Sequence, residues 1–104
     1  EFTLAGLTAT ASERVAAPRV AEAVANLECE TINHVLLPCV EGGRNLVVFG
    51  KVVGIHIRDD ALSDGFFDIT KVQPIARLGY RDYAVVRETF SMTRPAKGDS
   101  AIGM

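Results

Sequence analysis

The sequence predicts a mainly β fold of antiparallel strands with short helices, in which this chain alone does not complete the sheet. Residues 27–37 and 45–60 have the alternating or β-branched composition of strands and are separated by a turn. Residues 83–92 alternate in the same way and predict a third strand. Since three strands cannot close a barrel and leave edges exposed, we expect further strands from a missing segment or from a second chain.

Length, composition and charge are those of an ordinary globular domain. The chain has 104 residues, 48% of them hydrophobic and 23% charged, which is enough for one domain at most. The formal net charge is −2 with acids and bases intermixed, which argues against a nucleic-acid-binding surface. No apolar run approaches the ~20 residues that cross a bilayer, and the amino terminus lacks the features of a signal peptide. We therefore expect a cytoplasmic protein.

Residues 45–60 are the stretch around which the rest of the chain is organised. They contain no proline, and successive side chains of a strand point to opposite faces. The face expected in a core carries Lys51 among the apolar residues Val47, Phe49, Val53, Ile55 and Ile57. The other face carries Val48, Gly50, Val52, Gly54, His56 and Arg58. Its glycines either let the strand bend or leave space for a ligand, and we favour the bend.

Residues 27–37 predict the hairpin partner of this strand. The acids Glu28 and Glu30 are expected to face water, and Cys29 is expected to be a small buried hydrophobic residue. The Gly42-Gly43 pair supplies the positive φ angles that the turn between the two strands needs.

Helical structure is expected only in short pieces. Residues 18–27 admit either a short helix or an irregular turn that leads into the strand. Asp68 is suited to cap a second helical stretch, which Pro74 limits to short turns. Gly79 suits the position just after a helix, and the chain from Pro95 onward is expected to fray as a tail.

The residues with reactive side chains do not form a recognised catalytic or metal-binding motif. The potential zinc ligands are Cys29, Cys39, His34 and His56, and no pair of them has the spacing of a zinc site. No nucleophile is spaced to pair with a histidine in a recognised local motif, so a hydrolase has little support. A reducing compartment argues against a disulfide between the two cysteines. We predict no metal site.

Three series of short motifs follow one another in the chain. The first is EFTLAGLT at residues 1–8, PRVAE at 18–22 and LEC at 27–29. The second is NLV at 45–47 and GKVVGIHIRDD at 50–60. The third is PIARLG at 74–79 followed by Tyr83-Ala84. In this order they resemble the C-terminal half of a flavin reductase-like, flavoredoxin-type domain, and the resemblance covers nearly the whole chain.

The resemblance implies the FMN-binding split β-barrel fold. Residues 1–94 would be the C-terminal half of the domain, and residues 95–104 a flexible tail. An N-terminal half, missing here or present as a second chain, would complete the barrel and hold the FMN phosphate, and the whole would be a homodimer. The implied function is NAD(P)H-dependent reduction of flavin or electron transfer through bound FMN. The alternative is a non-catalytic β-barrel half that serves assembly or ligand binding.

The resemblance also implies which residues contact the cofactor, namely His56, Arg77, Gly79, Tyr80 and Tyr83. His56 would lie near the flavin or the nicotinamide, although a strand histidine satisfied by a neighbour has the same pattern. Arg77 would hold a phosphate, or it would instead cap a helical turn that Gly79 ends. Tyr80 stands where the family commonly has a glycine, and it would stack on the flavin or narrow the site. Tyr80 and Tyr83 are equally suited to packing. The sequence singles out no catalytic residue.

Overall fold

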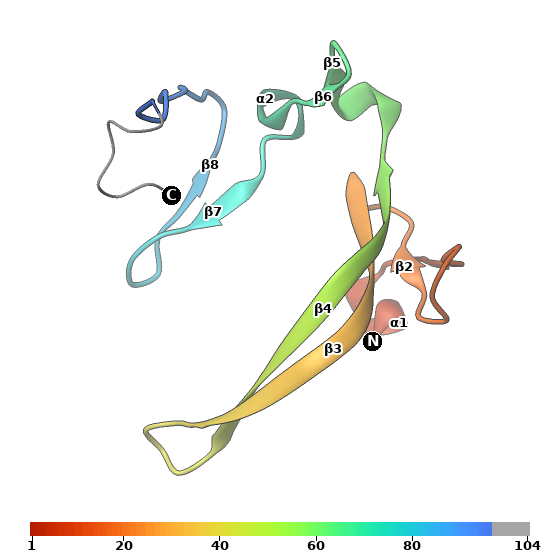
Figure 1. Cartoon of the computed structure of the whole chain (residues 1–104), viewed down its shortest axis with the longest axis vertical. Helices are drawn as coiled ribbons and strands as arrows, with labels where there is room; N and C mark the ends of the chain where they lie inside the picture. The colour runs from red at the N-terminus through yellow and green to blue at the C-terminus, as the bar shows by residue number, and fades with distance from the viewer. Residues whose placement is uncertain (97–104) are drawn as a thin grey trace. The chain divides into compact units, whose positions relative to one another are not determined.

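The computed structural model describes residues 1–96, which divide into two units at residue 67 (Figure 1). In the described residues every strand pairs with one antiparallel neighbour, the helices are short, and no barrel is closed. The prediction of a mainly β, antiparallel fold with short helices is therefore confirmed.

The first unit is built on a long hairpin of two strands, β3 (Ala25–Pro38) and β4 (Arg44–Ile57), each of 14 residues. The two strands pair antiparallel, as the sequence predicted, and the pairing runs from Ala25 opposite Ile57 to Pro38 opposite Arg44. The register shifts between Glu28 and Cys29 and again between Thr31 and Asn33. Such bulges insert an extra residue into one strand and change which residues lie opposite one another.

The turn at the tip of the hairpin uses one of the two predicted glycines in a left-handed conformation. Gly42 has φ +82°, whereas Gly43 is not among the residues with positive φ. The amide of Gly42 donates to the carbonyl of Cys39 at 3.1 Å, and the amide of Cys39 donates to the carbonyl of Gly43 at 3.3 Å. These bonds close the turn between β3 and β4.

The chain before the hairpin forms a short helix and a small strand pair. Helix α1 (Phe2–Ala5) ends at Gly6, which has φ +70°. Strand β1 (Ala9–Thr10) pairs with β2 (Arg19–Val20), so residues 11–18 form a loop between them. Of the two alternatives for residues 18–27, the irregular turn into a strand is the one observed. Helix α1 was not predicted.

After β4 the chain turns through a 3-10 helix, η1 (Asp59–Ala61), into the small pair β5 (Leu62–Ser63) and β6 (Phe66–Phe67). The strand predicted for residues 45–60 therefore ends earlier, at Ile57. The side chain of Arg58 donates to both carboxylate oxygens of Asp60, at 3.0 and 2.7 Å.

The second unit contains helix α2 (Ile69–Val72) and a hairpin of β7 (Ile75–Arg77) and β8 (Tyr83–Val85). Asp68 caps α2 as predicted, because its carboxylate accepts from the amide of Thr70 at 3.0 Å. Two predictions are wrong here. Gly79 lies in the turn between β7 and β8 rather than after a helix, and the third strand stops at Val85 instead of continuing to residue 92. Of the predicted tail, residues 97–104 lie outside the described residues.

Little of the described chain is buried. Within residues 1–96, only Ala61 and Glu28 are buried, each with 2% of its surface exposed. The apolar face predicted for β4 lies largely open, with Phe49 47% and Ile55 63% exposed. Cys29 is exposed rather than buried, and both cysteines are free. No helix in residues 1–96 has the length and apolar character needed to cross a membrane.

Candidate functional site

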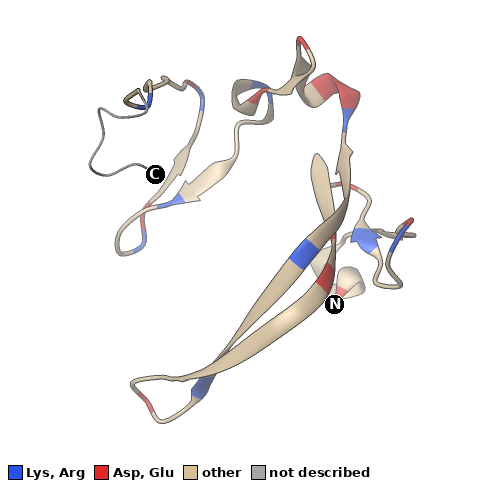
Figure 2. Ribbon diagram, in the orientation of Figure 1, with Lys and Arg blue, Asp and Glu red and all other residues tan. Residues whose placement is uncertain are grey.

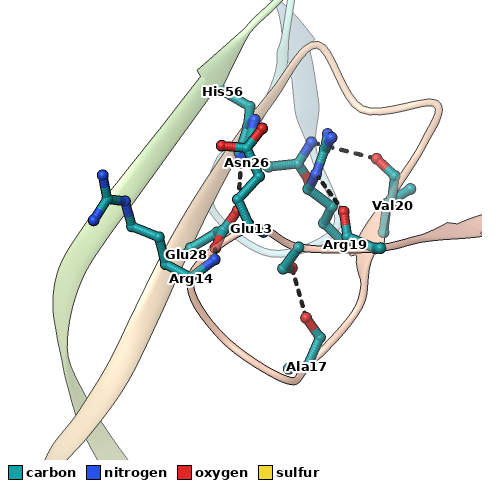
Figure 3. A network of polar contacts seen from close by, with 10 residues as sticks. Glu13, Arg14, Ala17, Arg19, Val20, Asn26, Glu28 and His56 are labelled. Atoms are coloured by element: carbon teal, nitrogen blue, oxygen red, sulfur yellow. Dashed lines mark hydrogen bonds and ion pairs between the residues drawn. The ribbon is translucent and has the colours of Figure 1, made fainter.

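A buried carboxylate, that of Glu28 on β3, lies at the centre of the polar contacts in the first unit (Figure 3). Its Oε1 accepts the amide of Arg14 at 2.6 Å, and its Oε2 accepts the amide of Glu13 at 2.9 Å. Oε2 also bonds Nε2 of His56 on β4 at 2.5 Å. One side chain thus joins both strands of the hairpin to the loop between β1 and β2.

Gly54 leaves the space that the Glu28 side chain occupies. It is paired with Glu28 across the hairpin. A Cβ atom at position 54 would lie 3.4 Å from Cβ and 3.5 Å from Cδ of Glu28. Gly54, which the sequence led us to interpret as the site of a bend in the strand, therefore lies against the Glu28 side chain.

Further hydrogen bonds shape the loop of residues 11–18 from within (Figure 3). The hydroxyl of Ser12 donates to the carbonyl of Ala17 at 2.6 Å, and Nε of Arg19 donates to the carbonyl of Ala11 at 3.2 Å. At the base of the hairpin, Nδ2 of Asn26 donates to the carbonyl of Val20 at 3.4 Å. These contacts give the loop a defined shape, in which two successive amides point at Glu28.

The hydrogen bonds keep Glu28 ionised. They lower the pKa of its carboxyl group from 4.5 to about 2, with the amide of Glu13 as the largest cause and the bond from His56 next. Burial acts in the opposite direction, because it disfavours the charged form. At neutral pH Glu28 is therefore an acceptor only, so Nε2 of His56 must carry the hydrogen between them.

The expectation that Glu28 faces water is wrong. The alternating sequence does not show that a glycine lies opposite it, or that the register shifts just after it. The signal that does exist is the pairing itself: a hairpin centred on residues 38–44 places Gly54 near Glu28. Glu30, which was predicted to face water as well, is exposed.

The second unit holds the other four predicted site residues, all in or beside the β7–β8 turn. Nη1 of Arg77 donates to the hydroxyl of Tyr83 at 2.9 Å, and Nη2 donates to the carbonyl of Tyr80 at 2.8 Å. The guanidinium carbon of Arg77 also lies 5.2 Å from the centre of the Tyr83 ring. The turn is closed by the amide of Leu78, which donates to the carbonyl of Asp82 at 2.9 Å.

Tyr80 has an unusual conformation for a bulky residue. Its φ is +56°, in the left-handed region that favours glycine, while Gly79 is not in that region. Its side chain is 94% exposed. The sequence placed Tyr80 where the resembled family commonly has a glycine, and the backbone here adopts the conformation that a glycine provides.

The predicted site residues therefore fall into two groups in the structure. Arg77, Gly79, Tyr80 and Tyr83 belong to one turn in the second unit, and His56 lies in the first unit with Glu28, which the prediction missed. Within residues 1–96 no group of three or more His, Cys, Asp or Glu side chains is placed to hold a metal ion.

Comparison with known proteins gives the family of this chain. Residues 1–83 match the family described as the flavin reductase like domain. An uncharacterized protein of Halalkalibacterium halodurans, BH2278, is 37% identical over 91% of this chain and 46% of its own length. The chain thus spans about half the length of the curated relatives that it matches.

Two solved structures resemble the chain. Nitrilotriacetate monooxygenase component B from Bacillus cereus is 30% identical, with a TM-score of 0.74 over 88% of this chain and 46% of that one. A candidate flavin reductase with a split barrel domain from Shewanella frigidimarina is 22% identical, with a TM-score of 0.68 over 90% of this chain and 46% of that one. The second likeness concerns the fold alone.

These findings give the chain the fold of a part of a split-barrel protein. The chain belongs to the flavin reductase-like family, and membership of this family implies flavin binding. The family and fold implied by the sequence motifs are confirmed.

Proposed function

We propose that the protein containing this chain is an FMN-binding oxidoreductase, which reduces flavin with NAD(P)H or passes electrons through bound FMN. The observation that carries the proposal is the family match over residues 1–83. In this proposal residues 1–94 are the C-terminal half of the domain. The working protein is a cytoplasmic homodimer whose barrel is completed by an N-terminal half or a second chain.

The side chains of the β7–β8 turn suit one part of a flavin nucleotide. Arginine has five N–H donors in a planar group, more than the two bonds from Arg77 to Tyr83 and Tyr80 use. The remaining donors match a phosphate. Those two bonds hold the Arg77 side chain in place, which reduces the entropy lost when it binds an anion. The exposed ring of Tyr80 offers a surface on which a flat ring can stack.

His56, in the first unit, is a separate candidate for a contact with the cofactor. Its side chain is 21% exposed, and its ring is fixed at Nε2 by Glu28. We assign it a hydrogen bond to the flavin or nicotinamide through its other nitrogen. Bound FMN supplies the hydride and electron chemistry, while the protein binds and orients it.

The proposal is tested on the full-length protein. We expect purified protein to show the absorption of oxidised flavin, or to gain it on titration with FMN, and to oxidise NADH or NADPH. Protein that stays colourless and takes up no FMN would overturn the proposal and favour a non-catalytic half-barrel. Uptake of FMN without oxidation of either nucleotide would overturn the NAD(P)H-dependent activity alone.

A pair of arginine variants tests the assigned contact. Arg77→Ala removes the charged donors, and hydrogen bonds to charged groups contribute about 1.5–3 kcal/mol, so FMN should bind roughly tenfold to hundredfold more weakly. Arg81→Ala is the control, because Arg81 is an exposed arginine of the same turn. Equal FMN affinities in the two variants would contradict the role of Arg77.

A further inference from the structure

We propose that Glu28 is a positioning residue that fixes the tautomer and orientation of His56, so that His56 gains and loses its proton only at Nδ1. This inference rests on the proposed function insofar as Nδ1 is the nitrogen offered to the flavin or nicotinamide. The juxtaposition that carries it is the contact between the buried carboxylate of Glu28 and Nε2 of His56.

The first step is that the Glu28 carboxylate cannot easily turn away. Each of its oxygens accepts a backbone amide, Oε1 from Arg14 and Oε2 from Glu13. Those amides belong to a loop that is itself tied by bonds from Ser12 and Arg19. A side chain held in this way keeps its neighbour in one orientation, as the partners of metal-bound histidines do.

The position of the hydrogen on the His56 ring follows from what each atom can donate. An ionised carboxylate has no hydrogen, so the contact requires the hydrogen on Nε2 of His56. A neutral ring then has Nδ1 as an acceptor, and a protonated ring has Nδ1–H as a donor. No described residue forms a hydrogen bond with Nδ1. The proton that distinguishes the protonated ring of His56 from the neutral ring is therefore the one on Nδ1.

Few other groups surround the Glu28–His56 pair. Glu28 faces His56 and Gly54 from β4, and the amides of Glu13 and Arg14 from the loop. A Cβ atom at position 54 would lie 3.6 Å from Cδ of Arg14, so the stem of that side chain packs against the same glycine. No second carboxylate is hydrogen-bonded to His56 in residues 1–96, so Glu28 is the acidic group that sets its tautomer.

Glu28→Ala tests whether the carboxylate sets the tautomer of His56. Oε2 accepts both the amide of Glu13 and Nε2–H of His56, so a glutamine would place its single oxygen there and keep the contact, whereas alanine removes both acceptors. Without an acceptor at Nε2, the ring of His56 can carry its hydrogen on either nitrogen. Glu30→Ala is the matched control, since Glu30 is an exposed glutamate two residues along the same strand.

The experiment is nitrogen NMR of the full-length protein with labelled histidine, read on the neutral ring of His56. We expect the Nε2–H tautomer alone in the wild type and in Glu30→Ala, and a mixture of both tautomers in Glu28→Ala. The Nδ1–H tautomer in the wild type would overturn the proposal, and so would an unmixed Nε2–H tautomer in Glu28→Ala. The wild-type spectrum decides even if Glu28→Ala fails to fold.

A kinetic measurement separates positioning of His56 by Glu28 from a role of Glu28 in holding the loop alone. With FMN bound, we expect Glu28→Ala to lower kcat for NAD(P)H oxidation about 10–100-fold, with a smaller change in KM. Ser12→Ala is the comparison, because it removes a bond that shapes the loop and leaves the Glu28–His56 contact intact. Equal losses in the two variants would contradict positioning. If the protein does not turn over NAD(P)H at all, the proposed function fails while the NMR result still tests Glu28.

Discussion

The two ends of the β3–β4 hairpin differ in what supports them. At the base, two amides of the chain's own loop donate to Glu28 on β3, and Glu28 in turn bonds His56 on β4. The outer half has neither feature. Beyond the paired Glu30 and Lys51, the strands carry no Asp, Glu or Lys and no Arg until Arg44 near the tip, so Figure 2 shows a long tan stretch there. Large apolar side chains there are exposed, among them Ile32, Leu36, Leu46, Val48 and Phe49.

The difference shows which part of the hairpin this chain can stabilise without other residues. The base is fixed by polar contacts within the chain, and these need only a short loop. The outer half has apolar surface that gains about 25 cal/mol for each Å² removed from water. Since the chain spans about half the length of its relatives, we expect the rest of the protein to cover that surface.

The largest expected change in stability comes from a substitution in the outer half of the β3–β4 hairpin. In the full-length protein, Phe49→Ala should lower the free energy of unfolding by about 3 kcal/mol, the usual cost of truncating a buried phenylalanine. Val40→Ala, in the fully exposed turn, is the control and should change it by less than about 0.5 kcal/mol. Denaturant unfolding measures both. A loss at Phe49 as small as that at Val40 would mean that the outer half stays uncovered.

The next prediction tests the base through pH. Folding lowers the pKa of Glu28 from 4.5 to about 2, so its ionised form contributes stability above about pH 4.5 that is lost as the pH falls towards 2. Glu28→Gln should therefore be less stable than wild type at neutral pH and show a shallower loss of stability between pH 4.5 and 2. Thermal unfolding across this range measures the slope. Equal slopes in the two proteins would contradict the account of Glu28.

A pair of glycine variants compares positions closer to and further from the base. A Cβ atom at Gly50 would lie 3.1 Å from Cβ of Cys29, whereas one at Gly54 meets its nearest atom at 3.4 Å. Gly50→Ala should cost about 1–3 kcal/mol because a strand must shift. Gly54→Ala should stay within about 0.5 kcal/mol. The reverse order, measured by denaturant unfolding, would show that the space beside Glu28 is the tighter one.

The smallest expected effect concerns the second unit. Tyr80 holds φ at +56°, a conformation that costs a residue with a side chain roughly 1 kcal/mol. Tyr80→Gly should relieve that strain and leave stability equal or raised by up to about 1 kcal/mol. Binding of FMN should weaken if the ring stacks on the cofactor, and an unchanged affinity would remove Tyr80 from the site. Tyr83→Phe, which keeps the ring but loses the hydroxyl that bonds Arg77, is a useful comparison.

The sequence predicted the long hairpin because its alternation extends over both strands and ends at a glycine-containing turn. It did not predict the buried Glu28, since that depends on the register shift after Glu28 and on the glycine across from it. Strand β8 was predicted too long because alternation continues past Val85, although its partner β7 has only three residues. Gly79 was wrongly assigned to a helix end. A lone glycine after apolar residues suits a helix end and a β-turn equally, so the sequence does not distinguish them.

The most direct test of the account is a titration of the full-length protein with FMN, followed by flavin fluorescence. The account predicts saturable binding that weakens in Arg77→Ala and stays near wild type in Arg81→Ala. Absence of saturable binding by the folded wild-type protein would contradict the assignment of this chain to an FMN site.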